Sequence, residues 1–169
     1  LNGGGAVIGC SSTNIVDVPN MVTNITGETF KGCSELKCIN LPNSIHKIDE
    51  YSFYDCPSLE SINVAPNNPI YKSVDGILYD KNIETLLLYP TNYQSKNYTI
   101  PTTVTSITSF AFNSKTNLQD ISIQSQQADY FEEFTILKNL KVIRVGKECE
   151  EIDTSVELLS LTAYDVDED

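Results

Sequence analysis

The chain has 169 residues, of which 40% are hydrophobic, and it carries a formal net charge of −12 at pH 7. Its length is sufficient for a single domain. The acidic balance disfavours nucleic acid and anionic membrane surfaces as partners, because phosphate contacts require clustered lysine and arginine. No apolar run approaches the roughly 18 residues of a membrane-spanning helix.

The first residues already follow the pattern of those that come later. Val7, Gly9 and Cys10 stand 23 positions before Phe30, Gly32 and Cys33. The run 7–12 resembles the end of a lipoprotein signal, but neither a basic region nor a longer apolar stretch precedes it. We therefore expect that the chain begins inside a repeat and that it is a fragment of a longer protein.

From residue 22 to residue 123, apolar residues recur with a period of 23. One row contains Val22, Ile25, Phe30, Cys33, Leu36, Ile39 and Leu41, and the next contains Ile45, Ile48, Phe53, Cys56, Leu59, Ile62 and Val64. After a gap, another row contains Val104, Ile107, Phe112, Lys115, Leu118, Ile121 and Ile123. A fixed period of this length predicts a solenoid, in which each unit buries its apolar face against its neighbours.

Each row divides into a strand and a return segment. The segment 36–42 alternates apolar and polar residues and stops at Pro42, which has no N–H to donate. The segment 25–33 spaces its apolar residues by five and three, which fits a compact turn or a short helical piece. One strand and one return per 23 residues is the unit of a leucine-rich repeat. We predict a curved, right-handed α/β solenoid with short parallel strands on its concave face.

Two columns of the repeat are expected to stack in the interior. The aromatic column contains Phe30, Phe53, Phe112 and Phe134, and stacked rings add about 1 kcal/mol per pair beyond burial. The cysteine column contains Cys10, Cys33 and Cys56. Side chains on neighbouring strands lie about 4.8 Å apart, whereas a disulfide needs about 3.8 Å between its Cβ atoms. The cysteines are therefore expected to be buried thiols.

An insert at about residues 66–97 interrupts the repeat. Asp75-Gly76 is a turn signal, because glycine tolerates positive φ. The segments 77–80 and 85–89 are rich in β-favouring residues and are separated by Lys81-Asn82, so they predict a β-hairpin. Residues 98–101 restore the strand of the repeat.

These rows resemble the BspA-like, or treponemal-type, leucine-rich repeats. The resemblance rests on residues 22–66 and 100–123, which read apolar-x-x-Ile-x4-Phe-x2-Cys-x2-Leu-x2-Ile-x-apolar, and on the insert segment 68–90. The family usually has alanine before the phenylalanine, which only Ala111 retains here. The resemblance implies a cell-surface or secreted protein used in adhesion and partner binding.

Beyond residue 123 the period loosens. The strand pattern returns at 140–145 and again at 161–166, and the segment 148–169 is strongly acidic. Irregular terminal repeats are typical of solenoid caps, so we predict capping repeats over about 124–169. The whole chain, residues 1–169, is expected to form one leucine-rich repeat domain.

No pattern in the sequence predicts catalysis. His46 is the only histidine, and its place in the repeat points to solvent. A nucleophile–base system, a phosphate-binding glycine loop and the spacing of metal ligands are all missing. We therefore expect a protein that is not an enzyme and that has no cofactor and no metal.

Two surfaces are candidates for binding. The outward residues of the strands are Asp17, Asn40, Asn63, Ser122, Arg144 and Asp165, and the insert adds Tyr71, Tyr79 and Tyr89. Ordinary solvated strand residues are the alternative for the first set, and packing of the hairpin against the solenoid is the alternative for the second. The predicted function is a binding module for a protein or glycan partner at the cell surface or in secreted form. The alternative is an intracellular or structural scaffold whose repeats serve assembly.

Overall fold

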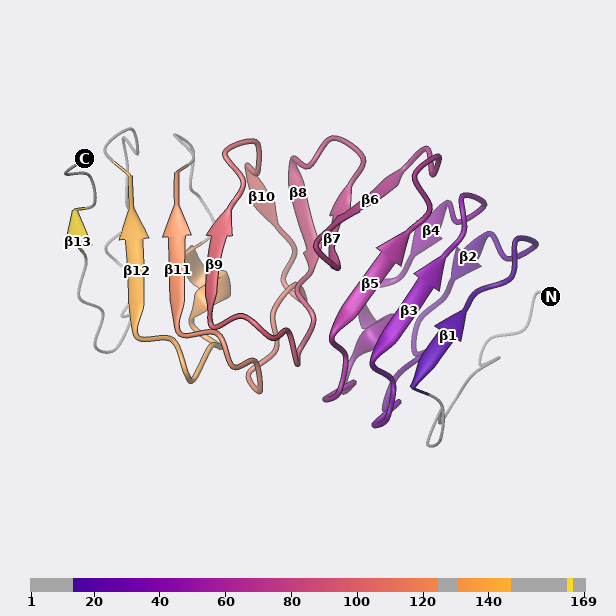
Figure 1. Ribbon diagram of the computed structural model, residues 1–169, viewed down its shortest axis with the longest axis horizontal. Coiled ribbons are helices and arrows are strands. Elements are labelled where there is room, and N and C mark those ends of the chain that lie inside the picture. Colours follow the sequence, from indigo (N-terminus) through magenta and orange to yellow (C-terminus); the bar gives the residue numbers. More distant parts are fainter. Residues whose placement is uncertain (1–13, 125–130, 147–163, 166–169) are drawn as a thin grey trace.

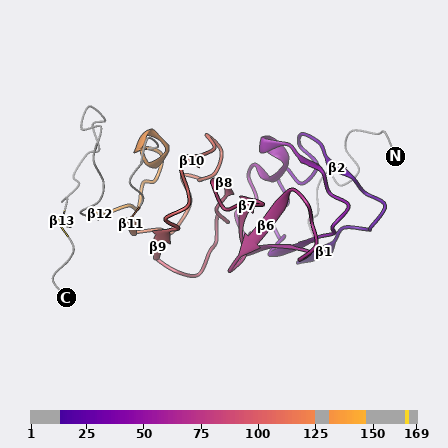
Figure 2. The ribbon, with the colours of Figure 1, turned by 90° about the horizontal axis from the view of Figure 1, so that it is seen from above.

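The computed structural model describes residues 14–124, 131–146 and 164–165, and its chain winds as a β-solenoid (Figure 1). One parallel sheet contains β1 (Ile15–Asp17), β3 (Cys38–Leu41) and β5 (Ser61–Val64). A second contains β9 (Asn97–Ile100), β11 (Asp120–Ile123), β12 (Val142–Val145) and β13 (Tyr164–Asp165). Figure 2 shows β1 and β9 along one side of the molecule and β2 and β10 along the other.

The opposite side carries shorter elements. They are β2 (Asn24–Ile25), β4 (Lys47–Ile48), β10 (Ser106–Ile107), and the 3-10 helices η1 (Glu50–Phe53) and η2 (Phe131–Phe134). β2 pairs with β4 in parallel, and η1 begins where the side chain of Asp49 accepts a hydrogen bond from the backbone N–H of Tyr51. Each coil therefore carries a strand on one side and a return segment on the other.

The α/β class predicted for this solenoid is not confirmed by the described residues, because their return segments contain 3-10 helix and turns but no α-helix. The reason lies in the backbone hydrogen bonds. The N–H of Phe30 donates to the carbonyl of Ser52 at 2.9 Å, and the N–H of Gly32 donates to the carbonyl of Tyr54 at 3.0 Å. Donors that serve the next coil are not available to the i−4 carbonyls that an α-helix requires.

The core divides into two clusters. One cluster is built from residues 25–62 and also contains Leu78, and the other runs from Ile77 to Ile143. In the first, the rings of Phe30 and Phe53 stack at 5.4 Å with an interplanar angle of 10°. Their stacking follows the constant period of 23, which sets equivalent side chains directly above one another.

The cysteine column is buried where the structure describes it. Cys33 and Cys56 have no exposed surface, and the Cys56 thiol donates to the carbonyl of Phe30 at 3.0 Å. Cys10 lies outside the described residues. The predicted burial is confirmed for the two described members of the column.

The insert contains the predicted hairpin and one strand more. β7 (Ile77–Asp80) pairs with β8 (Thr85–Leu88) in antiparallel fashion, as expected. The additional strand, β6 (Tyr71–Val74), pairs with β7 across the Asp75-Gly76 turn. The side chain of Asn68 is fully buried and donates to the carbonyl of Ile45 at 2.9 Å, which fastens the start of the insert to the coil before it.

The insert is also one coil of the solenoid. β8 pairs in parallel with β10, and the N–H of Tyr89 donates to the carbonyl of Ala111 at 2.8 Å. The ring of Tyr89 lies 5.5 Å from that of Phe112, which in turn lies 5.7 Å from that of Phe134. Tyr89 therefore occupies the aromatic column where the sequence rows showed a gap.

The two parallel sheets are separated by the insert. β5 does not pair with β9; instead the N–H of Ile62 on β5 donates to the carbonyl of Gly76 at 2.8 Å. Gly76 has φ +82°, and a Cβ atom there would lie 2.7 Å from that of Ser61. The turn thus approaches β5 closely enough to require glycine. We name residues 14–64 the N-terminal block and residues 97–146 the C-terminal block.

Candidate binding surfaces

Outward side chains of the parallel strands form the first candidate surface, which we name the ladder face. In the N-terminal block, Asp17 pairs with Asn40 and Asn40 with Asn63. Their side chains are joined as well: Asn63 Nδ2 donates to Asn40 Oδ1 at 2.9 Å, and Asn40 Nδ2 donates to Asp17 Oδ1 at 2.6 Å. This chain of hydrogen bonds fixes the three polar groups relative to one another.

In the C-terminal block, the ladder face contains Thr99, Ser122 and Arg144, which lie side by side in the register. Thr99 is exposed, and sequence reasoning missed it because the insert hides the row to which it belongs. Arg144 donates from Nη2 to Asp120 Oδ2 at 2.8 Å, and its Nε lies 3.2 Å from both carboxylate oxygens. Its guanidinium group is thus directed along the sheet by Asp120.

Contrary to the prediction from the sequence, Asp165 does not lie beside Arg144 in the strand register. The register pairs Arg144 with Tyr164, and Asp165 stands beside Val145. The spacing between equivalent positions is 23 from Asp17 to Asn40, and it falls to 22 between Ser122 and Arg144 and to 20 between Arg144 and Tyr164. The prediction of Asp165 as a ladder residue is therefore wrong.

The tyrosines of the insert do not form a contact patch. Tyr79 and Tyr89 are each 1% exposed, and the hydroxyl groups of Tyr79 and Tyr98 lie 2.7 Å apart. Burial raises the pKa of Tyr79 to about 12 and also raises the pKa of Tyr89. Tyr71 is half-buried, and its hydroxyl accepts from the N–H of Ile48 at 3.0 Å. Packing against the solenoid, the alternative for this set, is what the structure shows.

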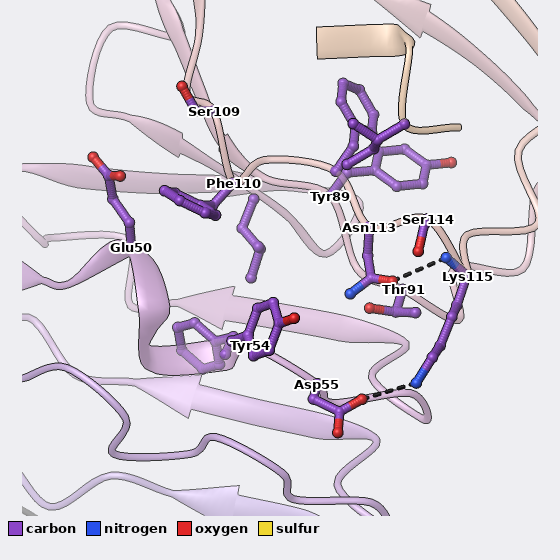
Figure 3. Close-up of a pocket in the computed structure, with 14 residues that line it drawn as sticks. Glu50, Tyr54, Asp55, Tyr89, Thr91, Ser109, Phe110, Asn113, Ser114 and Lys115 are labelled. Carbon is purple, nitrogen blue, oxygen red and sulfur yellow. Dashed lines mark hydrogen bonds and ion pairs between the residues drawn. The ribbon is translucent and has the colours of Figure 1, made fainter. Parts of the chain in front are cut away.

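A second candidate surface is a cavity of about 410 Å³ on the side of the return segments, which we name the seam cavity (Figure 3). It exists because the return of the insert coil is short. Leu86 pairs with Ile107, and Asn97 pairs with Asp120. The return from Leu86 to Asn97 spans residues 87–96, whereas the equivalent return from Ile107 to Asp120 spans residues 108–119. The flanking returns therefore face each other across the insert coil.

The floor of the seam cavity is apolar and its rim is polar. Phe53, Leu88, Tyr89 and Phe112 are among the floor residues, and Glu50, Tyr54, Asp55, Ser109, Asn113 and Lys115 are among those of the rim. The flanking returns touch at two points: the rings of Tyr51 and Phe110 lie 4.4 Å apart, and Lys115 Nζ lies 2.9 Å from Asp55 Oδ1. These contacts hold the two walls in place.

Sequence reasoning missed the seam cavity, although one signal was present. Lys115 stands in the cysteine column, where a lysine cannot remain buried without a partner. The structure shows that its ammonium group leaves the column and reaches Asp55 on the far wall, and that its backbone N–H donates to Asn113 Oδ1 at 2.9 Å. The hydrogen bond to Asp55 raises the pKa of Lys115.

In residues 14–124, 131–146 and 164–165, no three His, Cys, Asp or Glu side chains lie together as metal ligands. Within the same segments no helix has the length and apolar character to cross a membrane. His46 is exposed, as predicted.

Comparison with protein families now identifies the repeat. Residues 4–93 and 81–156 match the BspA type leucine rich repeat region, which is found in 6 copies. The chain therefore belongs to the BspA-type leucine-rich repeat family. No curated protein matches it.

Solved structures show the same fold. A leucine-rich repeat protein from Eubacterium ventriosum is 28% identical with a TM-score of 0.64, and the match covers 79% of this chain and 36% of that one. The pneumococcal vaccine antigen PcpA is 20% identical with a TM-score of 0.56, over 77% of this chain and 35% of that one. A leucine rich cell surface protein from Faecalibacterium prausnitzii is 19% identical with a TM-score of 0.55, over 80% of this chain and 48% of that one. The chain thus spans between a third and a half of the length of these proteins.

Proposed function

We propose that this chain is a non-enzymatic recognition module of a cell-surface or secreted protein, and that its ladder face binds a protein partner. The observation that carries the proposal is the set of outward polar side chains held in register on paired strands. A rigid array loses little conformational entropy when a partner contacts several strands at once. Membership of the BspA-type family and the likeness to a leucine rich cell surface protein support the location.

The ladder face suits a protein partner because its groups differ in hydrogen-bonding character. Asn63 is exposed and offers its amide oxygen, since its Nδ2 already donates to Asn40 and Cys38. Thr99 is exposed and offers a hydroxyl group that donates and accepts, and Asp17 offers a carboxylate. Arg144 adds a planar cation at the other end of the face, already oriented by Asp120. Mixed polar groups of this kind are typical of the rim of transient interfaces, in which water completes the contacts.

The test is a binding measurement on a partner isolated by pull-down from surface extracts and then purified. The double variant Asn63→Glu, Thr99→Glu places one new charge in each block at exposed positions. Arg144 is not replaced, because a carboxylate at this position would be repelled by Asp120 and would destabilise the fold, so that a loss of binding could not be separated from a loss of stability. The matched control is Ser34→Glu, Asn117→Glu, which adds the same charge in exposed turns away from the strands.

We expect the ladder variant to bind the purified partner at least about tenfold more weakly, since an unmatched charge in an interface costs more than about 1.4 kcal/mol. The control should bind like the parent protein. The ladder variant loses the hydrogen bond from Asn63 to Asn40, so its melting temperature is measured first and binding is compared well below it. Equal binding by the ladder variant and the parent would refute the assignment of the ladder face.

A further inference from the structure

We propose that the seam cavity is a binding site for a neutral sugar unit, such as a hexose or an N-acetylhexosamine of a glycan. This site is separate from the ladder face, since its rim comes from the return segments. The inference rests on the size of the cavity, the kinds of side chain that line it and the charges at its rim.

The size fits a small molecule. The volume of about 410 Å³ lies within the range of roughly 300–1,000 Å³ that is typical of ligand pockets. The walls are tied together by the ring contact between Tyr51 and Phe110 and by the ion pair between Lys115 and Asp55. Because the two walls already contact each other, their residues lose little conformational entropy when a ligand binds, which favours even a weakly interacting ligand.

The lining matches the two faces of a sugar ring. A pyranose has apolar C–H surfaces above and below and hydroxyl groups at its edge. Tyr54 and Phe110 both line the cavity and come from opposite walls (Figure 3), and Tyr54 is 52% exposed. The electron-rich faces of aromatic rings attract the positively polarised C–H groups of a sugar.

The rim offers partners to the hydroxyl groups. Glu50 and Ser109 lie at one end of the cavity, and Asn113 and Asp55 lie toward the other (Figure 3). Carboxylates accept hydrogen bonds from sugar hydroxyls, and the hydroxyl and amide groups both donate and accept. A ring seated between Tyr54 and Phe110 would therefore meet polar groups at both ends.

The charge at the rim disfavours an anionic ligand. Glu50 and Asp55 supply two carboxylates, and Lys115, the only cationic residue among the described residues that line this cavity, is paired with Asp55 at 2.9 Å. Together with the net charge of −12, this leaves the cavity negative. A sialic acid, uronic acid or phosphate would be repelled, whereas an uncharged sugar would not.

The proposal is tested by saturation-transfer NMR and calorimetry with the full chain. The probes are glucose, galactose, mannose, N-acetylglucosamine and lactose, with glucuronic acid and N-acetylneuraminic acid as anionic comparisons. N-acetyl-lysine methylamide and N-acetyl-arginine methylamide represent the side chains of a basic peptide. We expect at least one neutral sugar to bind with a millimolar Kd, and the anionic sugars to give no signal.

The variants locate the binding. Tyr54→Ala removes an exposed ring and should weaken sugar binding at least about tenfold, whereas Tyr54→Phe keeps the ring face and should retain it. Glu50→Gln should weaken binding, and Glu35→Gln, an equal change at an exposed residue that does not line the cavity, should not. The ladder variant Asn63→Glu, Thr99→Glu should bind sugar like the parent protein, so failure of one proposal is distinguishable from failure of the other.

Three results would overturn the inference. The first is no binding of any neutral sugar at concentrations up to tens of millimolar. The second is sugar binding that Tyr54→Ala leaves unchanged, which would place the sugar elsewhere. The third is tighter binding of the lysine or arginine probe with the same dependence on Tyr54, which would make the cavity a peptide site.

Discussion

The two blocks of the solenoid are built from the same repeat, yet they pack differently. In the N-terminal block the rings of Phe30 and Phe53 are nearly parallel, at 10°. In the C-terminal block the rings of Phe112 and Phe134 meet at 66°. The equivalent strand residues are 23 positions apart in the first block and 22 apart between Ser122 and Arg144 in the second.

The comparison shows what a constant period does. When the spacing stays at 23, equivalent side chains on neighbouring coils have the same surroundings. Phe53 therefore stacks on Phe30, Cys56 follows Cys33 in the core, and Asn63 lies beside Asn40. Between Phe112 and Phe134 the spacing is 22 and the rings meet at 66°. Tyr89 and Phe112 are 23 positions apart and already tilted at 38°, so the ring orientation does not depend on the spacing alone. The insert lies between the two blocks and connects their cores, because the ring of Tyr89 packs against that of Phe112 and continues the aromatic column.

The largest expected effect is on the aromatic column of the N-terminal block. Phe53 is 6% exposed and packs on Phe30, so Phe53→Ala should lower the free energy of unfolding by about 3–5 kcal/mol. Urea denaturation followed by circular dichroism measures this loss. A variant that melts within a degree or two of the parent protein would contradict the stacked column.

The next effect concerns the insert and depends on pH. Tyr79 has a pKa raised to about 12 when folded, against about 10 when unfolded, because burial disfavours the phenolate. The stability that this burial confers is complete below pH 10 and is lost as the pH rises through about 12.

Ultraviolet titration of the tyrosines measures this difference. We expect Tyr79 and Tyr89 to ionise well above pH 10 or together with unfolding, because burial raises the pKa of both. Replacing Tyr79 by Phe should reduce this late-ionising component, and Tyr89 should account for what remains. A single transition near pH 10 for all tyrosines in the folded protein would contradict the burial of the insert.

A smaller effect tests how closely the insert approaches β5. Gly76→Ala should destabilise by about 1–3 kcal/mol, because the new methyl group meets Ser61 and the residue keeps a positive φ. The matched control is Gly32→Ala, where φ is +72° but no atom lies within 4 Å of the new group. Gly32→Ala should therefore lower the free energy of unfolding by less than Gly76→Ala. If urea denaturation shows equal losses for the two variants, the close approach of Gly76 to Ser61 is ruled out.

Much of the fold could be predicted from the sequence because the period of 23 is explicit in the N-terminal block. This period predicts the strands, the buried columns and the alignment of Asp17, Asn40 and Asn63, which the register confirms. The 3-10 character of the returns could not be predicted, because it depends on hydrogen bonds between coils such as that from Phe30 to Ser52. Asp165 was misplaced because the spacing changes near the end of the described chain.

The sites were harder to predict than the fold. Tyr79 and Tyr89 were assigned to a surface because tyrosine serves both cores and interfaces, and only the pairing of β8 with β10 places Tyr89 inside. The seam cavity depends on Asp55 and Lys115, which are 60 positions apart and come together over a shortened return. No local pattern records such a contact.

Hydrogen–deuterium exchange of the insert tests the central claim most directly. The account makes the insert a coil of the solenoid, with β8 paired to β10 and Tyr89 donating to Ala111. Backbone amides in peptides covering residues 77–80 and 85–89 should therefore exchange as slowly as those of β5 and β11. Exchange of these peptides within seconds, while β5 and β11 remain protected, would show a surface hairpin and contradict the account.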